Sequence, residues 1–324
     1  MYISLHCVDY VLMHFFSRHL AILTLLAAAA AMFFPELFLI FKHYFLWFFA
    51  ATMFALGLVM KPVEAKEALS KPWAIFVGVG TQYTVMPLLG FGAAMVSVEF
   101  GVEPSIALGF IIVGCAPGAM ASNVISYLLG GAVAFSIAMT MLATILSPVM
   151  TPVLVELLGG VIMEIPFLPM MKTIITSVLL PLLLGMIIHH YLPRFQKTYE
   201  HIAPEIAAIA IIIICSYAVA ANNERLNNIP VLIFLLVILL NAGGYLAGWM
   251  VGRLFHFERR YQITLAIEIG MQNAGLGVAL ALAHFEPETA LVGAMFAVWC
   301  ILTAAGLGKL NTFKAKKEEA IPAI

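Results

Sequence analysis

The stretch EIGMQNAGLG at residues 268–277 lies in the middle of an apolar run that extends from 261 to 284. A second irregular stretch, GCAPGAMASN at residues 114–123, lies inside the apolar run from 105 to 128. Proline and clustered glycines interrupt helices, and the backbone groups that a break frees in apolar surroundings need a partner helix, a bound ion or a water-filled cavity. Close packing of small residues between helices would also explain the glycines. Because polar side chains accompany them, we predict two broken helices.

The composition of the whole chain indicates that these runs belong to a membrane protein. Of the 324 residues, 63% are hydrophobic and 10% are charged. Ordinary soluble domains do not reach these values, and the length accommodates about ten helical spans of roughly 20 to 25 residues. The formal net charge of −1 does not indicate a nucleic-acid partner. The four cysteines lie too far apart in the sequence to indicate a disulfide framework or a metal site.

We predict an all-α membrane protein with about ten transmembrane helices. A lead-in at 1–19 precedes one transporter domain at 20–309, and a cytoplasmic tail follows at 310–324. If the N-terminus is cytoplasmic, all of the 16 lysines and arginines except Lys42, Lys172 and Arg225 fall into cytoplasmic segments. This asymmetry predicts a multi-pass protein of the inner (plasma) membrane with both termini in the cytoplasm. The predicted spans are 20–41, 43–60, 72–98, 105–128, 131–157, 165–191, 202–221, 229–252, 261–284 and 287–308.

The spans divide into two halves near Gly159 and Gly160. With five spans each, the second half must be inverted relative to the first, and inverted repeats are typical of secondary transporters. The two irregular stretches are then the fourth span of each half. A channel would share such a polar lining, but paired broken helices suit alternating access better. Because no catalytic pair of side chains is placed at depth, we do not predict an enzyme.

Glu268 is the single acidic residue that we place at depth in the bilayer. An ionised carboxylate there costs several kcal/mol unless it is paired or protonated. No lysine or arginine is predicted at the same depth, so the counter-charge must be a proton or a metal cation from outside the chain.

The residues around Glu268 favour a hard monovalent cation. Ser136 and Thr140 lie four residues apart on one helical face, as do Glu268 and Gln272. Neutral oxygens with one carboxylate suit Na⁺ better than Ca²⁺, Zn²⁺ or copper. A proton carried by Glu268 stays open, in which case the hydroxyl and amide groups would be hydrogen bonds between helices. The neutral candidates are Gln82, Ser122, Asn123, Ser136, Thr140 and Gln272.

These motifs resemble those of the bile acid:sodium symporter family, over about residues 20–310. The resemblance is carried by GTQY at 80–83 with Met86-Pro87, APG at 116–118 with ASNV at 121–124, LSP at 146–148 with Thr151-Pro152, and the stretch at 268–277. It implies sodium-coupled symport of an organic anion, such as a bile acid or a small carboxylate. It also implies a panel domain of spans 1, 2, 6 and 7, and a core domain of spans 3–5 and 8–10 in which the broken helices cross.

The resemblance further implies two sodium sites and a substrate site beside the crossing. Asn273 becomes a candidate for holding an anionic head group. Met120 stands where some relatives have a threonine that helps to hold the substrate. The first sodium site would comprise Ser122, Asn123, Ser136, Thr140 and Glu268, and the second Gln82, Glu268, Gln272 and the carbonyls of Ile269 and Met271.

Overall fold

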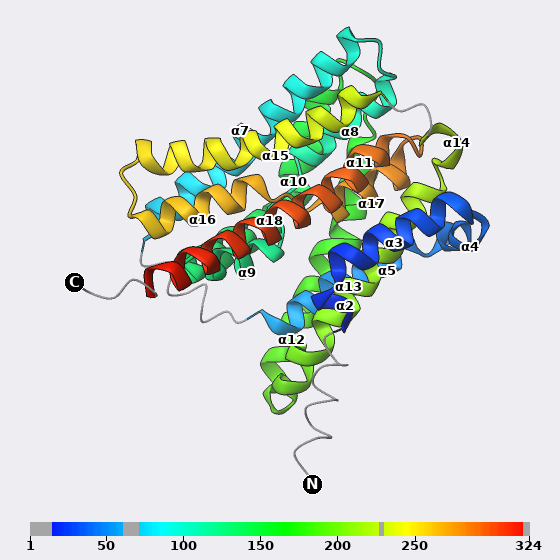
Figure 1. Ribbon diagram of the computed structural model, residues 1–324. Coiled ribbons are helices and arrows are strands. Elements are labelled where there is room, and N and C mark those ends of the chain that lie inside the picture. Colours follow the sequence, from blue (N-terminus) through cyan, green and yellow to red (C-terminus); the bar gives the residue numbers. More distant parts are fainter. Residues whose placement is uncertain (1–14, 61–70, 227–229, 320–324) are drawn as a thin grey trace.

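The computed structural model describes residues 15–60, 71–226 and 230–319, and the regular secondary structure of that part is helical, without a strand (Figure 1). This confirms the all-α fold class. The first half contains α2 (Phe15–Arg18), α3 (Leu20–Phe33), α4 (Glu36–Leu39), η1 (Ile40–His43), α5 (Phe45–Val59), α7 (Pro72–Glu99), α8 (Pro104–Gly114), α9 (Ala121–Leu128) and α10 (Val133–Gly159). The second half contains α11 (Phe167–Ile174), the π-helical η2 (Ile175–Leu179), α12 (Leu180–Tyr191), η3 (Pro193–Phe195), α13 (Gln196–Ala220), α14 (Asn223–Leu226), α15 (Val231–Leu254), α16 (Arg259–Gly270), α17 (Ala274–His284) and α18 (Thr289–Glu319).

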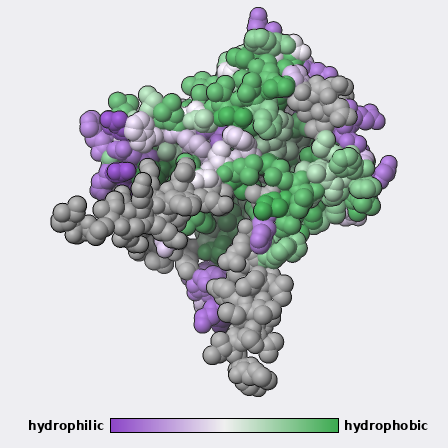
Figure 2. Space-filling model, in the orientation of Figure 1, coloured by the Kyte–Doolittle hydropathy of each residue, from purple (hydrophilic) through white to green (hydrophobic). Residues whose placement is uncertain are grey.

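Several of these helices are suited to cross a bilayer. Within the described residues, five are long and apolar enough: Pro72–Glu99, Val133–Gly159, Phe167–Tyr191, Pro193–Ala220 and Val231–Leu254. Shorter apolar helices accompany them at Phe45–Val59, Pro104–Gly114, Ala274–His284 and Thr289–Thr303. Figure 2 shows a largely hydrophobic surface over the body of the molecule, with hydrophilic side chains towards its extremities. The chain is therefore a multi-pass membrane protein.

The first predicted span, 20–41, is not one straight helix. The chain bends by 110° between Ile22–Phe33 and Glu36–His43. Pro35 lies at this bend and has no N–H to continue the helical hydrogen bonds, so α3 ends shortly before it. At the other end of the chain, α18 continues to Glu319, through residues that we predicted to belong to the tail. The first fourteen residues of the predicted lead-in (1–19) and the last residues of the tail, 320–324, lie outside the described residues, while α2 (Phe15–Arg18) falls within the lead-in.

The helices pack in two groups, which lie side by side in Figure 1. In one group α5 packs against α12 and α13, and α13 packs against α3. In the other group α7 packs against α8, α15 against α16, and α18 against both α8 and α17. Helix α10 packs against α7, α9 and α16 and also contacts α11, while α13 contacts α17 and α18.

Glycine allows the closest of these helix contacts. A Cβ atom at Gly248 of α15 would lie 2.5 Å from the carbonyl oxygen of Leu265, and one at Gly244 would lie 2.9 Å from the Cα of Gly270. Helix α15 therefore lies directly on the backbone of α16. Such contact between small residues is a common way for helices to associate in lipid. It fixes α16, the helix that carries Glu268, against a long neighbour.

Candidate functional site

The two predicted broken helices are present, and their breaks meet. The first break separates α8 from α9, and the second separates α16 from α17. The Ala119 amide donates to the Met271 carbonyl at 2.8 Å, and the Asn273 amide donates to the Pro117 carbonyl at 2.8 Å. These bonds form an isolated antiparallel bridge at Gly118 and Gln272. Each break thus satisfies part of the backbone that the other exposes.

Side chains from the neighbouring helices satisfy further carbonyls at the breaks. The Gln82 amide donates to the Ala116 carbonyl at 3.0 Å, and the Thr151 hydroxyl donates to the Cys115 carbonyl at 2.8 Å. The Asn241 amide donates to the Gly270 carbonyl at 2.9 Å. The sequence did not single out Thr151 or Asn241 as site residues. Asn241 was a polar side chain in an apolar helix, and most such side chains simply form hydrogen bonds between helices. Thr151 belonged to one of the motifs that carry the family resemblance, which did not assign it a role in the site.

Glu268 lies in the last turn of α16, and only 1% of its surface is exposed. The hydroxyl groups of Ser122 and Ser136 donate to its Oε1 atom, and the Thr140 hydroxyl donates to Oε2 at 2.8 Å. All three hydroxyl-bearing residues are fully buried. In the part of the chain that the structure describes, no lysine or arginine forms an ion pair with Glu268. The described hydrogen-bond partners of this carboxylate are therefore neutral hydroxyl groups.

Gly118 lets this carboxylate lie directly against the first break. A Cβ atom at Gly118 would be 3.0 Å from Glu268 Oε2, which is tighter than ordinary van der Waals contact. The glycine therefore has a steric reason to be there besides the break itself. Since Gly118 also belongs to the bridge between the breaks, the carboxylate lies where the two broken helices touch.

A second group of amides lies next to this carboxylate. Gln82 Nε2 donates to Gln272 Oε1 at 2.8 Å, and Gln272 Nε2 donates to the Ile269 carbonyl at 2.7 Å. Gln82 Oε1 and Asn123 Oδ1 are buried and accept no hydrogen bond in the described part of the chain. A buried acceptor without a donor costs about 1 to 3 kcal/mol. A cation would relieve that cost, because these oxygens could then serve as its ligands.

The structure thus brings most of the predicted ligands close together in space. Ser122, Ser136 and Thr140 converge on Glu268. In the second set Gln82, Gln272 and the Ile269 carbonyl form one chain of hydrogen bonds, whereas the Met271 carbonyl accepts from Ala119. The described residues contain no group of three His, Cys, Asp or Glu side chains that could hold a metal ion. The available ligands are therefore oxygens with a single carboxylate, which suits Na⁺.

The two predicted substrate residues occupy equivalent places. Met120 is the N-cap of α9 and Asn273 is the N-cap of α17, so each precedes the second half of a broken helix. Both are half-buried. The Asn273 side chain accepts a hydrogen bond from the Leu276 amide at 3.1 Å, which fixes its oxygen on the helix. The positive ends of α9 and α17 consequently lie next to the two breaks.

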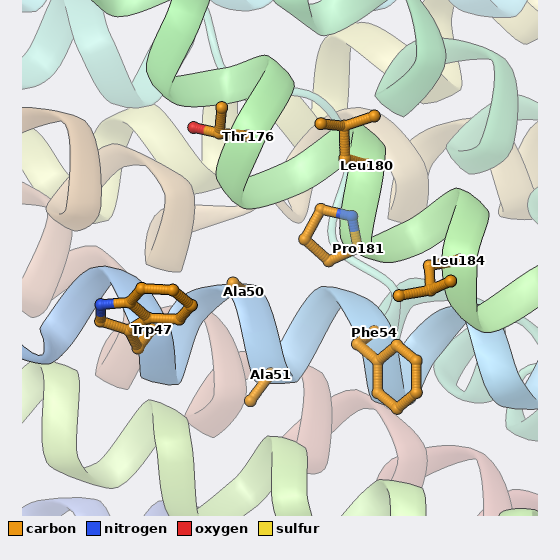
Figure 3. A pocket seen from close by; sticks show the side chains of 8 residues that line it. All are labelled: Trp47, Ala50, Ala51, Phe54, Thr176, Leu180, Pro181 and Leu184. Carbon is orange, nitrogen blue, oxygen red and sulfur yellow. The ribbon is translucent and has the colours of Figure 1, made fainter.

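An apolar groove of about 370 Å³ lies elsewhere, between α5 and the segment formed by η2 and α12 (Figure 3). It contains none of the predicted site residues. Its walls are almost entirely hydrocarbon, and the Thr176 hydroxyl is the one side-chain oxygen among the lining residues. The lining residues are Trp47, Ala50, Ala51, Phe54, Thr176, Leu180, Pro181 and Leu184.

Comparison with known proteins shows the family of this chain. The family described as Sodium Bile acid symporter family matches residues 46–229, which include the first break and the three hydroxyl-bearing residues that contact Glu268. The chain belongs to this family. A protein of Bacillus subtilis (strain 168) named "Uncharacterized sodium-dependent transporter YocS" is 37% identical over 309 residues, which are 95% of this chain and 95% of that protein.

More distant members of the family come from plants and animals. "Probable sodium/metabolite cotransporter BASS1, chloroplastic" of Arabidopsis thaliana is 35% identical over 248 residues, 76% of this chain and 61% of that protein. "Ileal sodium/bile acid cotransporter" of Oryctolagus cuniculus is 27% identical over 245 residues, 74% of this chain and 69% of that protein. The names of these relatives share sodium but differ in the second solute.

Proposed function

We propose that the chain is a sodium-coupled symporter of an organic anion, such as a bile acid or a small carboxylate. The observation that carries this proposal is Glu268, which is buried among three hydroxyl groups at the junction of two broken helices. A carboxylate in such a place needs a cation to offset its desolvation, and the neutral oxygens around it are suitable ligands for Na⁺.

The proposed architecture has ten spans in two inverted five-helix repeats. Spans 4 and 9 are the pairs α8–α9 and α16–α17, and span 1 is the bent pair of α3 with α4. The panel consists of α3, α5, α11–α13 and the short helices between them, and the core consists of α7–α10 and α15–α18. The separate packing of these two groups supports the division. We also propose an inner-membrane location with both termini in the cytoplasm, which rests on the distribution of basic residues.

Two sodium ions are proposed to bind in the core. The first would be held by Glu268 with Ser122, Ser136 and Thr140, and by the unpartnered oxygen of Asn123. The second would be held by Glu268, Gln82 and Gln272 with the backbone carbonyls of 269 and 271. Gln82 Oε1 supports this second site because, in the described part of the chain, it is a buried acceptor that lacks a donor.

Ion binding would prepare the site for the anion. Two sodium ions beside one carboxylate leave a net charge of about +1 at the junction, and the N-termini of α9 and α17 add their partial positive charges. A substrate carboxylate would be attracted there, next to Asn273 and Met120. Because the anion is favoured only when the ions are present, its binding is coupled to theirs. Movement of the core against the panel would then expose the site to each side in turn.

The test is uptake of labelled taurocholate, pantoate and pyruvate into proteoliposomes, with an inward gradient of Na⁺ or of K⁺. We expect Na⁺-dependent uptake of at least one anion by the wild type and none by Glu268→Ala. The variant Glu258→Gln removes a carboxylate next to the surface end of the same helix and serves as the matched control. Uptake that ignores Na⁺ and follows a pH gradient would refute sodium coupling and make Glu268 a proton carrier. Currents far above transporter turnover would instead indicate a channel.

A further inference from the structure

A pocket lined by polar and apolar side chains lies at the end of the α15–α16 hairpin, away from the proposed ion site. It has a volume of about 400 Å³ and is lined by Trp249, Arg253, Arg259, Gln262 and Ile263. The hairpin turn lies at the left edge of the view in Figure 1, and hydrophilic side chains gather at that end of the molecule in Figure 2. Two guanidinium groups therefore lie in this pocket beside an aromatic and an aliphatic side chain.

The two arginines of this pocket have no acidic partner among the described residues. The nearby carboxylate of Glu258 binds Lys71 at 2.9 Å and Arg260 at 3.0 Å. The hydrogen bond from Lys71 holds the pKa of the Glu258 carboxyl below its usual value, so this group stays ionised and engaged. In the described part of the chain, neither Arg253 nor Arg259 lies within ion-pair distance of a carboxylate. Among the residues that the structure describes, the lining of the pocket thus carries an excess of positive charge.

The surroundings of the pocket are those of a membrane interface. The guanidinium of Arg253 lies over the Trp249 ring at 4.9 Å from its centroid, and tryptophan is enriched at the level of lipid headgroups. On the same helix Leu246, Met250 and Leu254 expose more than half of their surfaces, as expected where acyl chains cover a helix. A ligand of this pocket would therefore have its anionic part beside the arginines and an apolar part along α15.

We propose that this pocket binds the phosphate of an anionic phospholipid headgroup. Guanidinium groups form paired, charge-assisted hydrogen bonds with phosphate oxygens. In a zwitterionic headgroup the headgroup's own cation would partly cancel this electrostatic attraction. Arg259 is also the first residue of α16, where the free N–H groups of the helix favour an anion. Glu268 follows nine residues later, about 14 Å along the axis at 1.5 Å per residue. The bound headgroup would thus hold the first turn of the helix that carries the buried carboxylate in its last turn.

The test is native mass spectrometry of the full-length protein with an equal mixture of phosphatidylglycerol and phosphatidylcholine that have the same acyl chains. We expect the wild type to retain phosphatidylglycerol in preference. Each of Arg253→Gln and Arg259→Gln should lower this preference about fivefold, and the double variant about thirtyfold. These factors follow because each variant removes the attraction that is typical of one basic residue near an anionic lipid surface. The single variants carry the test if the double variant does not fold.

Arg194→Gln is the matched control, because Arg194 also lies over an aromatic ring, that of Phe195 at 4.8 Å, but outside this pocket. It should leave the preference unchanged. Retention of the wild-type preference by both single variants would overturn the proposal, as would an equal loss in Arg194→Gln. Displacement of phosphatidylglycerol by excess inorganic phosphate would show that the site takes free phosphate and not a lipid.

Discussion

Replacement of Glu268 by glutamine should abolish the response of the protein to sodium without unfolding it. A sodium ion about 4 Å from the carboxylate charge gains roughly 4 kcal/mol at an effective dielectric constant of 20. Loss of that charge therefore lowers the affinity for Na⁺ by about a thousandfold. Glutamine has nearly the same shape, so Ser122 and Ser136 can still donate to its oxygen. Its NH₂ group can donate to the Thr140 hydroxyl oxygen, because that hydroxyl can turn its single proton from the side chain at 268 to the Ser136 carbonyl, which lies 3.0 Å away.

The same substitution removes a charge that is expensive to bury. An ionised carboxylate at the bilayer centre costs about 2.5 to 3.5 kcal/mol on insertion scales. In potassium buffer the Glu268→Gln variant should therefore be at least as stable as the wild type. This combination of unchanged or higher stability with a lost ion response separates a role in ion binding from a role in folding.

The assay is thermal unfolding of the purified protein in detergent, in NaCl and in KCl at equal ionic strength. At a Na⁺ concentration about a hundred times the dissociation constant, binding stabilises the wild type by about 2.7 kcal/mol. Glu268→Gln should unfold at the same temperature in both salts, whereas the control Glu258→Gln should keep the full sodium response. If Glu268→Gln is stabilised by Na⁺ as strongly as the wild type, the carboxylate is not the counter-charge of the ion and the reasoning fails.

Three further substitutions test the geometry around this carboxylate. Gly118→Ala places a Cβ atom 3.0 Å from the Glu268 carboxylate. The apparent Na⁺ affinity in a titration should therefore fall about tenfold. An unchanged affinity would show that the carboxylate moves freely. Gln82→Leu removes the amide oxygen that Gln82 would contribute to the proposed second sodium site. The Hill coefficient of sodium-dependent uptake should then fall from about 2 to about 1. A coefficient that stays constant excludes Gln82 as a ligand. Thr151→Val leaves the buried Cys115 carbonyl without its donor and should lower the free energy of unfolding by about 1 to 3 kcal/mol, measured by thermal unfolding. Thr144→Val is its control, because the Thr144 hydroxyl donates within its own helix, and an equal loss in both variants would count against a specific role of Thr151.

The local sequence was sufficient to predict the class of protein, the two breaks and most of the candidate ligands. Hydrophobic runs define helices in lipid because every backbone group must be satisfied within the segment. Glycine, proline and polar side chains inside such runs are exceptions, because polar groups without a partner cost free energy in the bilayer. Glu268 could be recognised in this way without any knowledge of its neighbours. The bend at Pro35 was missed, because a proline near the end of an apolar run is compatible with either a loop or a continuous span.

Only the tertiary structure decided which side chains meet. Ser122, Ser136 and Thr140 are separated from Glu268 by 146, 132 and 128 positions in the chain. Helical periodicity places a residue on a face but does not say which helix that face will contact. The pairing of the two breaks through Gly118 and Gln272 likewise depends on how α8, α9, α16 and α17 pack. The sequence by itself predicted that a buried carboxylate needs a counter-charge, either a proton or a metal cation. The packing of α9 and α10 against α16 determined which hydroxyl oxygens surround it, because hydrogen bonds between helices depend on distances that no local pattern encodes.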